Sequence, residues 1–279
     1  MPIHDQSYRR YGGHRTMPGM AWLVIAWAGI LTLIRKRAFM GLLLFAWLPF
    51  LVRAVQIYVT TNFPQAAMFA ATAETFRAFL GQQDFFVFVV TIYVGAGLIA
   101  NDRRANALQI YLSKPLMRSE YIAGKAAVLF TFLLFVTLLP AILLLLLQVL
   151  FAGSFSFLRT NLFLFPAITV ATLLQTLVAT FTMLALSSLS KSSRYVGILY
   201  AGIVFFTKSI YTVMSAITGS TSLSWISLGD NVSQVIDVIF QLKPRYATPW
   251  PVSLIVVVGL VVVSISVLER RVRGVEVVT

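Results

Sequence analysis

The chain has 279 residues, of which 59% are hydrophobic and only 11% are charged. A soluble domain is typically about half apolar and about one quarter charged, so this composition excludes a water-soluble core and predicts a membrane protein. The formal net charge is +13, but the basic residues cluster at the ends of apolar runs, which indicates membrane topology rather than nucleic-acid binding. There is no cysteine, which excludes disulfides and cysteine-based metal sites.

The first apolar run follows a polar N-terminal tail and covers Met20–Ile34. About 20 apolar residues are needed to cross a bilayer, so this run is short for a span. The basic residues Arg35-Lys36-Arg37 that follow it argue against a cleavable signal peptide. We predict a helix in the cytoplasmic membrane interface, with Trp22 and Trp27 at headgroup level. A transmembrane position for this run remains the alternative.

Six further apolar runs are predicted to be transmembrane helices. They are Phe39–Val59, Phe85–Ala100, Ala123–Phe151, Leu162–Leu189, Tyr195–Ile217 and Pro249–Leu268. The connections on the side of the two termini hold most of the Lys and Arg residues, so the positive-inside rule places both termini in the cytoplasm. We predict one all-α transmembrane domain over 1–279, consisting of a cytoplasmic tail with the interfacial helix (1–38), a six-span bundle (39–268) and a second cytoplasmic tail (269–279).

Two of the outer connections are long. Thr60–Asp84 has helix-like spacing around Ala66–Leu80, and Thr218–Thr248 has apolar residues at helical intervals. These intervals are set by Trp225, Val232, Val235, Ile236 and Ile239. We predict that both connections contain short helices resting on the outer leaflet, with ordinary polar loops as the alternative.

The connection between the second and third spans has the most informative pattern. Asn101 or Asp102 can cap a helix N-terminus, and an apolar face follows at helical spacing. This face consists of Ala107, Leu108, Tyr111 and Leu112, and the remaining surface carries Arg103, Arg104, Asn106 and Gln109. Pro115 disfavours helical geometry at the residue before it and so ends the helix. Ser119 can cap the next helix, with Glu120 in its first turn.

The pattern thus predicts a short, stiff cytoplasmic helix with an apolar face and a charged rim. From these residues alone, the face could pack on the bilayer or neighbouring helices, or it could dock on a partner. The stretch resembles the permeases of the ABC-2 family. The resemblance rests on Gly95, Gly97, Asp102-Arg103, Leu108, Ser113-Lys114-Pro115, Arg118, Glu120-Tyr121 and Gly124-Lys125. It implies an ABC-2 (type V exporter-like) architecture of six spans with an N-terminal interfacial helix.

In that family the connection is similar to a coupling helix that sits in a groove of a separate ATPase subunit. The resemblance implies that residues 101–120 couple this chain to such an ATPase. It assigns the packed contact to Leu108, Tyr111 and Leu112, the rim charges to Arg103, Arg104 and Arg118, and the geometry of the lever to Asp102 and Pro115, with Glu120 following in the next helix.

The chain lacks the G-x-x-x-x-G-K-[ST] phosphate-binding loop, because Gly124-Lys125 is followed by Ala126. We therefore expect that this chain does not hydrolyse ATP and binds no cofactor, and that ATP and Mg²⁺ belong to the partner ATPase. The two histidines, His4 and His14, lie in the N-terminal tail. Their position argues against a metal site or a Ser–His catalytic site within the membrane.

Two basic residues, Arg53 and Lys208, lie inside predicted spans. A charge at membrane depth is costly and suggests a function, here the lining of a pathway for an anionic or zwitterionic substrate. The alternative is that these side chains snorkel to the interface or pair with Asp84 or Glu74.

These patterns and the resemblance lead to one main functional hypothesis. We expect a permease subunit of an ATP-binding cassette exporter in the plasma (inner) membrane, paired with ATPase subunits and with a second copy or paralogue. A stand-alone secondary transporter is one alternative, which would show inverted repeats and acidic residues inside its spans. Neither is evident in the sequence. A membrane scaffold or assembly factor is the other alternative.

Overall fold

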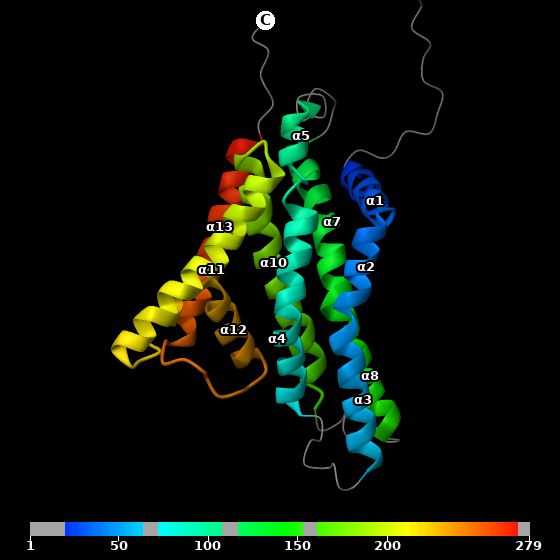
Figure 1. Cartoon of the computed structure of the whole chain (residues 1–279), viewed down its shortest axis with the longest axis vertical. Coiled ribbons are helices and arrows are strands. Elements are labelled where there is room, and N and C mark those ends of the chain that lie inside the picture. Colours follow the sequence, from blue (N-terminus) through cyan, green and yellow to red (C-terminus); the bar gives the residue numbers. More distant parts are fainter. Residues whose placement is uncertain (1–19, 64–71, 108–116, 153–160, 273–279) are drawn as a thin grey trace, which may run out of the picture.

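The computed structural model describes residues 20–63, 72–107, 117–152 and 161–272, and every regular element in these ranges is helical (Figure 1). The elements in chain order are α1 (Ala21–Ile34), α2 (Arg37–Ala46), α3 (Leu48–Asn62), α4 (Ala73–Val90), the π-helical η2 (Thr91–Gly95), α5 (Ala100–Arg104), α7 (Arg118–Val136), α8 (Leu138–Ala152), α10 (Leu164–Leu189), α11 (Ser193–Thr218), the 3-10 turn η3 (Ser224–Ile226), α12 (Leu228–Ile239) and α13 (Trp250–Arg271). The predicted all-α fold class is confirmed.

Six helical segments are long and apolar enough to cross a membrane, as predicted. They are Arg37–Asn62, Ala73–Arg104, Arg118–Phe151, Leu164–Leu189, Ser193–Thr218 and Trp250–Arg271. Two of them are pairs of helices: α2 passes into α3 at Trp47, just before Pro49, and α7 passes into α8 at Thr137, before Pro140. Proline has no backbone N–H and its ring crowds the preceding turn, which accounts for both breaks.

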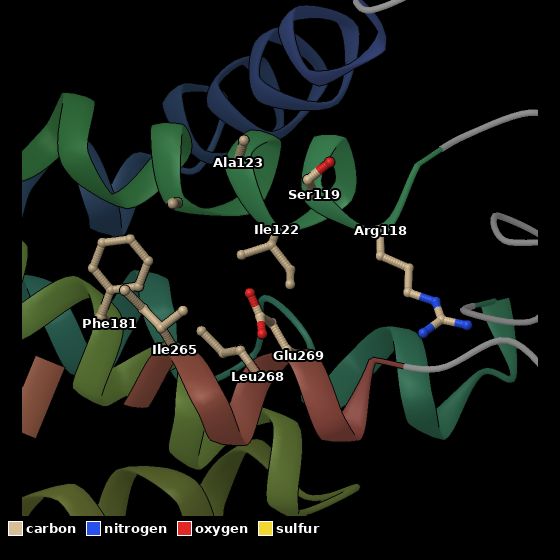
Figure 2. A pocket seen from close by; sticks show the side chains of 9 residues that line it. Arg118, Ser119, Ile122, Ala123, Phe181, Ile265, Leu268 and Glu269 are labelled. Atoms are coloured by element: carbon tan, nitrogen blue, oxygen red, sulfur yellow. The ribbon is translucent and has the colours of Figure 1, made fainter. Parts of the chain in front are cut away.

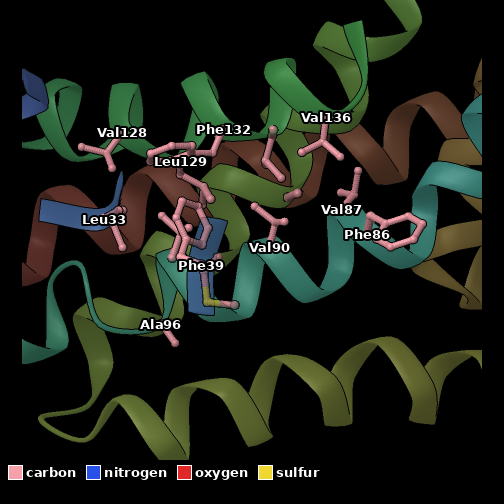
Figure 3. Packing of buried hydrophobic residues seen from close by; sticks show 14 of the residues in the cluster. Leu33, Phe39, Phe86, Val87, Val90, Ala96, Val128, Leu129, Phe132 and Val136 are labelled. Carbon is pink, nitrogen blue, oxygen red and sulfur yellow. The ribbon is translucent and has the colours of Figure 1, made fainter. Parts of the chain in front are cut away.

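The bundle has two ends that are easily told apart. Figure 1 shows α5, the start of α7 and the end of α13 together at one end, which we call the α5 end, and the ends of α3 and α8 at the other. The main hydrophobic core lies where α2, α4, α7 and α10 meet (Figure 3). Phe39 is fully buried there, and its ring lies edge-on to Phe132 at 4.7 Å between centroids. A second cluster, which includes Leu80, joins α4 to α3, α8 and α12.

The N-terminal helix α1 is shorter than a span and packs along α7. The two helices approach closely at glycines, because a Cβ on Gly29 would clash with Val128 and one on Gly124 would clash with Ile25. Trp27 is 63% exposed, which suits a helix with one face toward lipid. The predicted helix is confirmed, and its position in the interface stays a prediction.

The helix expected around Ala66–Leu80 is not a separate outer element. From Ala73 onward this stretch is the beginning of α4, which continues without interruption into the second span; residues 64–71 lie outside the described ranges. Thr72 occupies the N-cap, and its backbone N–H donates to Thr75 Oγ1 at 3.2 Å. The helix that contains the second span therefore begins at Ala73, 12 residues before the predicted start at Phe85, because polar residues such as Arg77 interrupt the apolar pattern but find partners inside the bundle.

The helix expected in the other long connection exists as α12, and Ser227 caps it by accepting a hydrogen bond from the backbone N–H of Asp230. Its expected place on the outer leaflet stays a prediction, but it is not a helix that lies apart from the spans. It packs against α10, α11 and α13 (Figure 1). Its polar side chains are buried: Asp230, Asn231, Gln234 and Asp237. Buried polar groups need partners, and these come from α4, α11 and the connection to α13.

Candidate functional site

Three side chains, Asp102, Tyr121 and Lys125, join the two ends of the connection between the second and third spans, and we call this cluster the clamp. The Asp102 carboxylate in α5 accepts a hydrogen bond from the Tyr121 hydroxyl at 2.7 Å and pairs with Lys125 Nζ, also at 2.7 Å. Lys125 lies 5.5 Å from the centre of the Tyr121 ring. Tyr121 and Lys125 stand one helical turn apart on α7, so α5 and the first turns of α7 are tied to each other.

The predicted caps in this region are wrong in detail. Ile99, not Asn101 or Asp102, is the N-cap of α5, because Asp102 is engaged by α7. Helix α7 begins at Arg118, and Met117 rather than Ser119 is its N-cap. The Glu120 carboxylate accepts a hydrogen bond from the Met117 backbone N–H at 3.0 Å. Glu120, at the third helical position, thus satisfies a backbone donor at the helix start, which is the role expected of Ser119.

The predicted helix of the connection does not run unbroken from Asn101. Helix α5 ends at Arg104, and Asn106 has a φ of 54°, the left-handed geometry in which asparagine often terminates a helix. Four predicted site residues lie outside the described ranges: Leu108, Tyr111, Leu112 and Pro115. Their roles stay predictions.

The three arginines expected at the rim have different environments. Arg103 Nη1 donates to the backbone carbonyl of Ser188 near the end of α10, which ties α5 to a third span. Arg104 is exposed and has no hydrogen bond or ion pair within the described part of the chain. Arg118 is exposed at the start of α7 and lines a groove toward α13. Of the predicted rim charges, Arg103 is thus used internally, and Arg104 and Arg118 face outward.

The second span changes its helical form before it reaches the clamp. Helix α4 passes into the π-helical η2 and then a turn before α5, and such a change leaves backbone groups without their usual partners. The Ser187 hydroxyl of α10 supplies them: it accepts from the N–H groups of Ile99 and Ala100 at 3.1 and 3.0 Å and donates to the Ala96 carbonyl at 2.9 Å. Gly95 permits this approach, because a Cβ there would clash with Met183 of α10.

A cavity of about 290 Å³ lies among α4, α10, α11 and α12. Its walls combine apolar side chains, including Phe88 and Phe205, with Asp84, Lys208 and Asp230. Asp84 comes from α4 and accepts a hydrogen bond from the Gln175 amide of α10. Sequence reasoning placed Asp84 at the end of an outer loop, whereas it lies within α4, the continuous helix that leads into the second span.

Lys208 is neutralised on one side of this cavity. Its Nζ lies 2.8 Å from both carboxylate oxygens of Asp230, and the Tyr246 hydroxyl donates to the same carboxylate at 2.8 Å. Burial and the neighbouring Asp230 carboxylate raise the pKa of Tyr246, so its hydroxyl stays a donor. The suggested pairing of Lys208 with Asp84 or Glu74 is wrong.

Arg53 does not join Lys208. Its guanidinium donates to the side-chain oxygens of Gln56 and Gln82 at 2.8 and 3.2 Å, and it does not line the cavity. Its suggested pairing with Asp84 or Glu74 is wrong, because two glutamines supply its acceptors. The pathway roles of Arg53 and Lys208 stay predictions.

A buried ion pair that sequence reasoning missed connects α4 to α12. Arg77 is 3% exposed, and its Nε lies 2.5 Å from Asp237 Oδ1. Arg245 Nε approaches the other carboxylate oxygen at 2.8 Å from the connection to α13. The partners are 160 residues apart in sequence, so no local pattern could have identified them. This pair fixes α12, which lines one side of the cavity, against α4 of the second span.

Comparison with known proteins places this architecture in a family. A family model described as "ABC-2 family transporter protein" matches residues 23–271, which contain all six spans, the clamp and the cavity. The search of curated proteins finds no match. Members of the matched family are multi-pass membrane permeases and are not themselves the ATPase. Because the match covers nearly the whole sequence, the chain belongs to the ABC-2 family of transporter proteins.

Proposed function

We propose that this permease is the membrane-spanning subunit of an ATP-driven exporter and that residues 101–120 couple it to a separate ATPase. ABC-2 permeases generally pair with an ABC ATPase. The observation that carries the coupling proposal is the clamp of Asp102 with Tyr121 and Lys125. A connection that transmits force must be stiff where it joins the spans, and this clamp ties both of its ends together.

The contacts around the clamp support a path for the movement. A push on the connection would act on the second and third spans through the clamp. It would reach the fourth span through Arg103, which bonds the Ser188 carbonyl, and through Ser187, which bonds the turn between η2 and α5. The backbone groups of this turn share one hydroxyl, so their hydrogen bonds can be rearranged at a small cost in free energy. Irregular helical turns of this kind serve as hinges. We therefore assign the hinge of the second span to Ala96–Ile99.

The cavity beside Lys208 and Asp230 is our candidate for part of the translocation pathway. It lies between the second and fifth spans. Helix α11 also exposes large apolar side chains along its length, including Ile198, Phe206 and Ile217, and this face suits contact with lipid or with a second permease. We propose a dimer of permeases, each with its own ATPase, in the plasma (inner) membrane with both termini cytoplasmic.

The first experiment is co-purification of the permease with a candidate ATPase, followed by measurement of ATP turnover in proteoliposomes. Leu108→Asp combined with Tyr111→Asp should leave the permease folded but release the ATPase. Asp102→Ala should retain the ATPase and lose the stimulation of its turnover by the permease, because the lever loses its clamp. Lys191→Gln, which removes an exposed charge from the connection between α10 and α11, is the matched control and should behave as the wild type.

Two outcomes would contradict the proposal. If no ATPase binds the wild type, or if the double variant holds the ATPase equally well, residues 101–120 are only a packed connection. If Asp102→Ala stimulates the ATPase as well as Lys191→Gln does, the clamp has no part in coupling.

A stand-alone secondary transporter is favoured by one observation, the Asp84 carboxylate in the cavity wall, because carboxylates at membrane depth often carry ion coupling. The two functions are distinguished by uptake into vesicles that contain the permease alone. Transport that needs only an ion gradient, and that Asp84→Asn abolishes, would replace the ATP-driven function. Transport that needs the ATPase and survives dissipation of the gradient would support it.

A further inference from the structure

A second cavity, separate from the candidate pathway, opens between α7, α10 and α13 at the α5 end (Figure 2). Its volume is about 480 Å³. We call it the α7–α13 groove. Its walls are largely apolar, with Ile122 and Ala126 from α7, Phe181 from α10, and Ile265 and Leu268 from α13. None of these residues belongs to the clamp or lines the cavity beside Lys208.

The groove is polar at its outer end and apolar farther in. Arg118 is the first residue of α7, and Glu269 lies in the last turn of α13. Ala126 lies about 12 Å farther along α7 at the helical rise of 1.5 Å per residue, at the depth of the apolar wall. This order, with charge at the helix ends and apolar side chains toward the membrane interior, matches the order of headgroup and acyl chain in a phospholipid.

The two charges at the mouth have opposite sign. Figure 2 shows the Arg118 side chain at the edge of the groove and the Glu269 carboxylate directed across it toward Ile122. Within the described ranges neither side chain has an ion pair or a hydrogen bond. Arg270 and Arg271, the neighbours of Glu269, do not line the groove. The mouth therefore offers one cationic donor and one anionic acceptor to the same ligand.

We propose that the α7–α13 groove binds one zwitterionic aminophospholipid, such as phosphatidylethanolamine, from the leaflet at the α5 end. Arg118 donates to the phosphate, and Glu269 accepts from the primary ammonium, which are the charge-assisted contacts that each group makes best. One acyl chain lies against Ile122, Ile265 and Phe181. A quaternary choline has no N–H to donate, and an anionic phosphatidylglycerol brings no cation to Glu269, so both should bind less well.

The test is native mass spectrometry of the purified permease after exchange into micelles with equal amounts of phosphatidylethanolamine, phosphatidylcholine and phosphatidylglycerol. We expect one retained phosphatidylethanolamine per chain. Glu269→Gln should weaken its retention roughly tenfold through the loss of one charge-assisted contact. Ile265→Trp should displace all three lipids by filling the groove. The matched controls are Arg270→Gln, next to Glu269, and Val262→Trp on an exposed part of α13, and both should retain lipid as the wild type does.

Size-exclusion profiles and melting temperatures of all variants establish that they are folded. Equal retention of the three lipids by the wild type, or equal loss of lipid in Ile265→Trp and Val262→Trp, would overturn the proposal. Lipid that binds the permease alone but is absent from its complex with the ATPase would instead assign the groove to ATPase docking. Lipid retention by the permease alone needs neither transport activity nor an ATPase, so its failure is distinguishable from a failure of the proposed coupling, although Arg118 belongs to both proposals.

Discussion

Two clusters of this permease use the same three residue types, an aspartate that accepts hydrogen bonds from one tyrosine and one lysine, yet they differ in how open they are. At the α5 end the side chains of Lys125 and Asp102 are 14% and 19% exposed. Beside the cavity the side chain of Asp230 is 8% exposed, but that of Lys208 is 50% exposed. The first cluster encloses both charges, and the second buries only its carboxylate.

The difference indicates different tasks for the same chemistry. The enclosed cluster joins α5 to the adjoining α7. Asp102 and Lys125 also border a pocket beside α1, but both charged side chains are largely buried, which suits a permanent clamp. The other cluster joins α11, α12 and the connection to α13 around the cavity wall. A lysine that is half exposed can leave its carboxylate for a ligand at modest cost, because exposed ion pairs contribute little. The comparison therefore supports the proposed division between a part that transmits force and a part that meets substrate.

The largest effect is expected at the ion pair of Arg77 and Asp237, in which both side chains are buried. Asp237→Ala leaves Arg77 buried without its carboxylate, and breaking a buried pair in this way costs roughly 3–5 kcal/mol. We expect this variant to lose most of its folded yield and to melt far below the wild type in a detergent thermal-shift assay. Arg245→Gln removes the partner whose side chain is 51% exposed and is the control with a small effect. Equal melting of the two variants would show that burial does not set the strength of these clusters.

The next largest effect is expected at the clamp. Asp102→Ala leaves Lys125 largely enclosed without its acceptor and should destabilise the α5 end by roughly 1.5–3 kcal/mol, the range for hydrogen bonds to charged groups. Hydrogen exchange of the first turns of α7 should accelerate, while exchange in α12 stays unchanged. Accelerated exchange in both regions would mean that the clamp is part of the general stability of the bundle and not a local joint.

The sequence was sufficient to predict the number and order of the spans and the short α1, because each depends on the length of an apolar run. It was misleading where a long helix carries polar residues. Arg77 and Asp84 made the first turns of α4 resemble a loop, and their acceptors and donors lie on α12 and α10. The buried position of α12 could not be predicted for the same reason, because Asp237 pairs with a residue 160 positions away in sequence.

At the site, sequence patterns identified Asp102 as important but for the wrong local reason. A capping pattern and a tertiary ion pair use the same carboxylate, and only the approach of Lys125 from the next helix decides between them. The Ser187 contacts had no signal at all, because a serine in an apolar helix is ordinary and the unpaired backbone groups of η2 and its turn are not visible in the sequence. The left-handed Asn106 was likewise unexpected within a helical pattern.

Ser187→Ala tests the proposed hinge at Ala96–Ile99, which lies next to the clamp. The variant removes one hydroxyl that serves three backbone groups, so we expect a loss of roughly 1–3 kcal/mol, the cost of leaving a buried backbone donor without an acceptor. Exchange of the Ile99 and Ala100 amides should accelerate, and ATPase stimulation should fall with it. Ser188→Ala is the matched control, because among the described residues the Ser188 hydroxyl donates to the Ala185 carbonyl of its own helix and has no partner on another helix. Equal effects of the two variants would remove Ser187 from the hinge.

The smallest effect on stability, and the most selective effect on function, is expected at Lys208. Lys208→Gln removes a half-exposed partner of Asp230, and an ion pair of that exposure contributes about 0–1 kcal/mol, while Tyr246 remains to donate to the carboxylate. The melting temperature should therefore stay near that of the wild type, whereas substrate-stimulated ATP turnover should change. The matched variant Lys125→Gln, at the enclosed cluster, should lower the melting temperature more and should reduce turnover with and without substrate alike. If the two variants change the melting temperature and the ATP turnover by the same amounts, exposure of the lysine does not distinguish the clusters. The proposal that the cavity is part of the translocation pathway would then be contradicted.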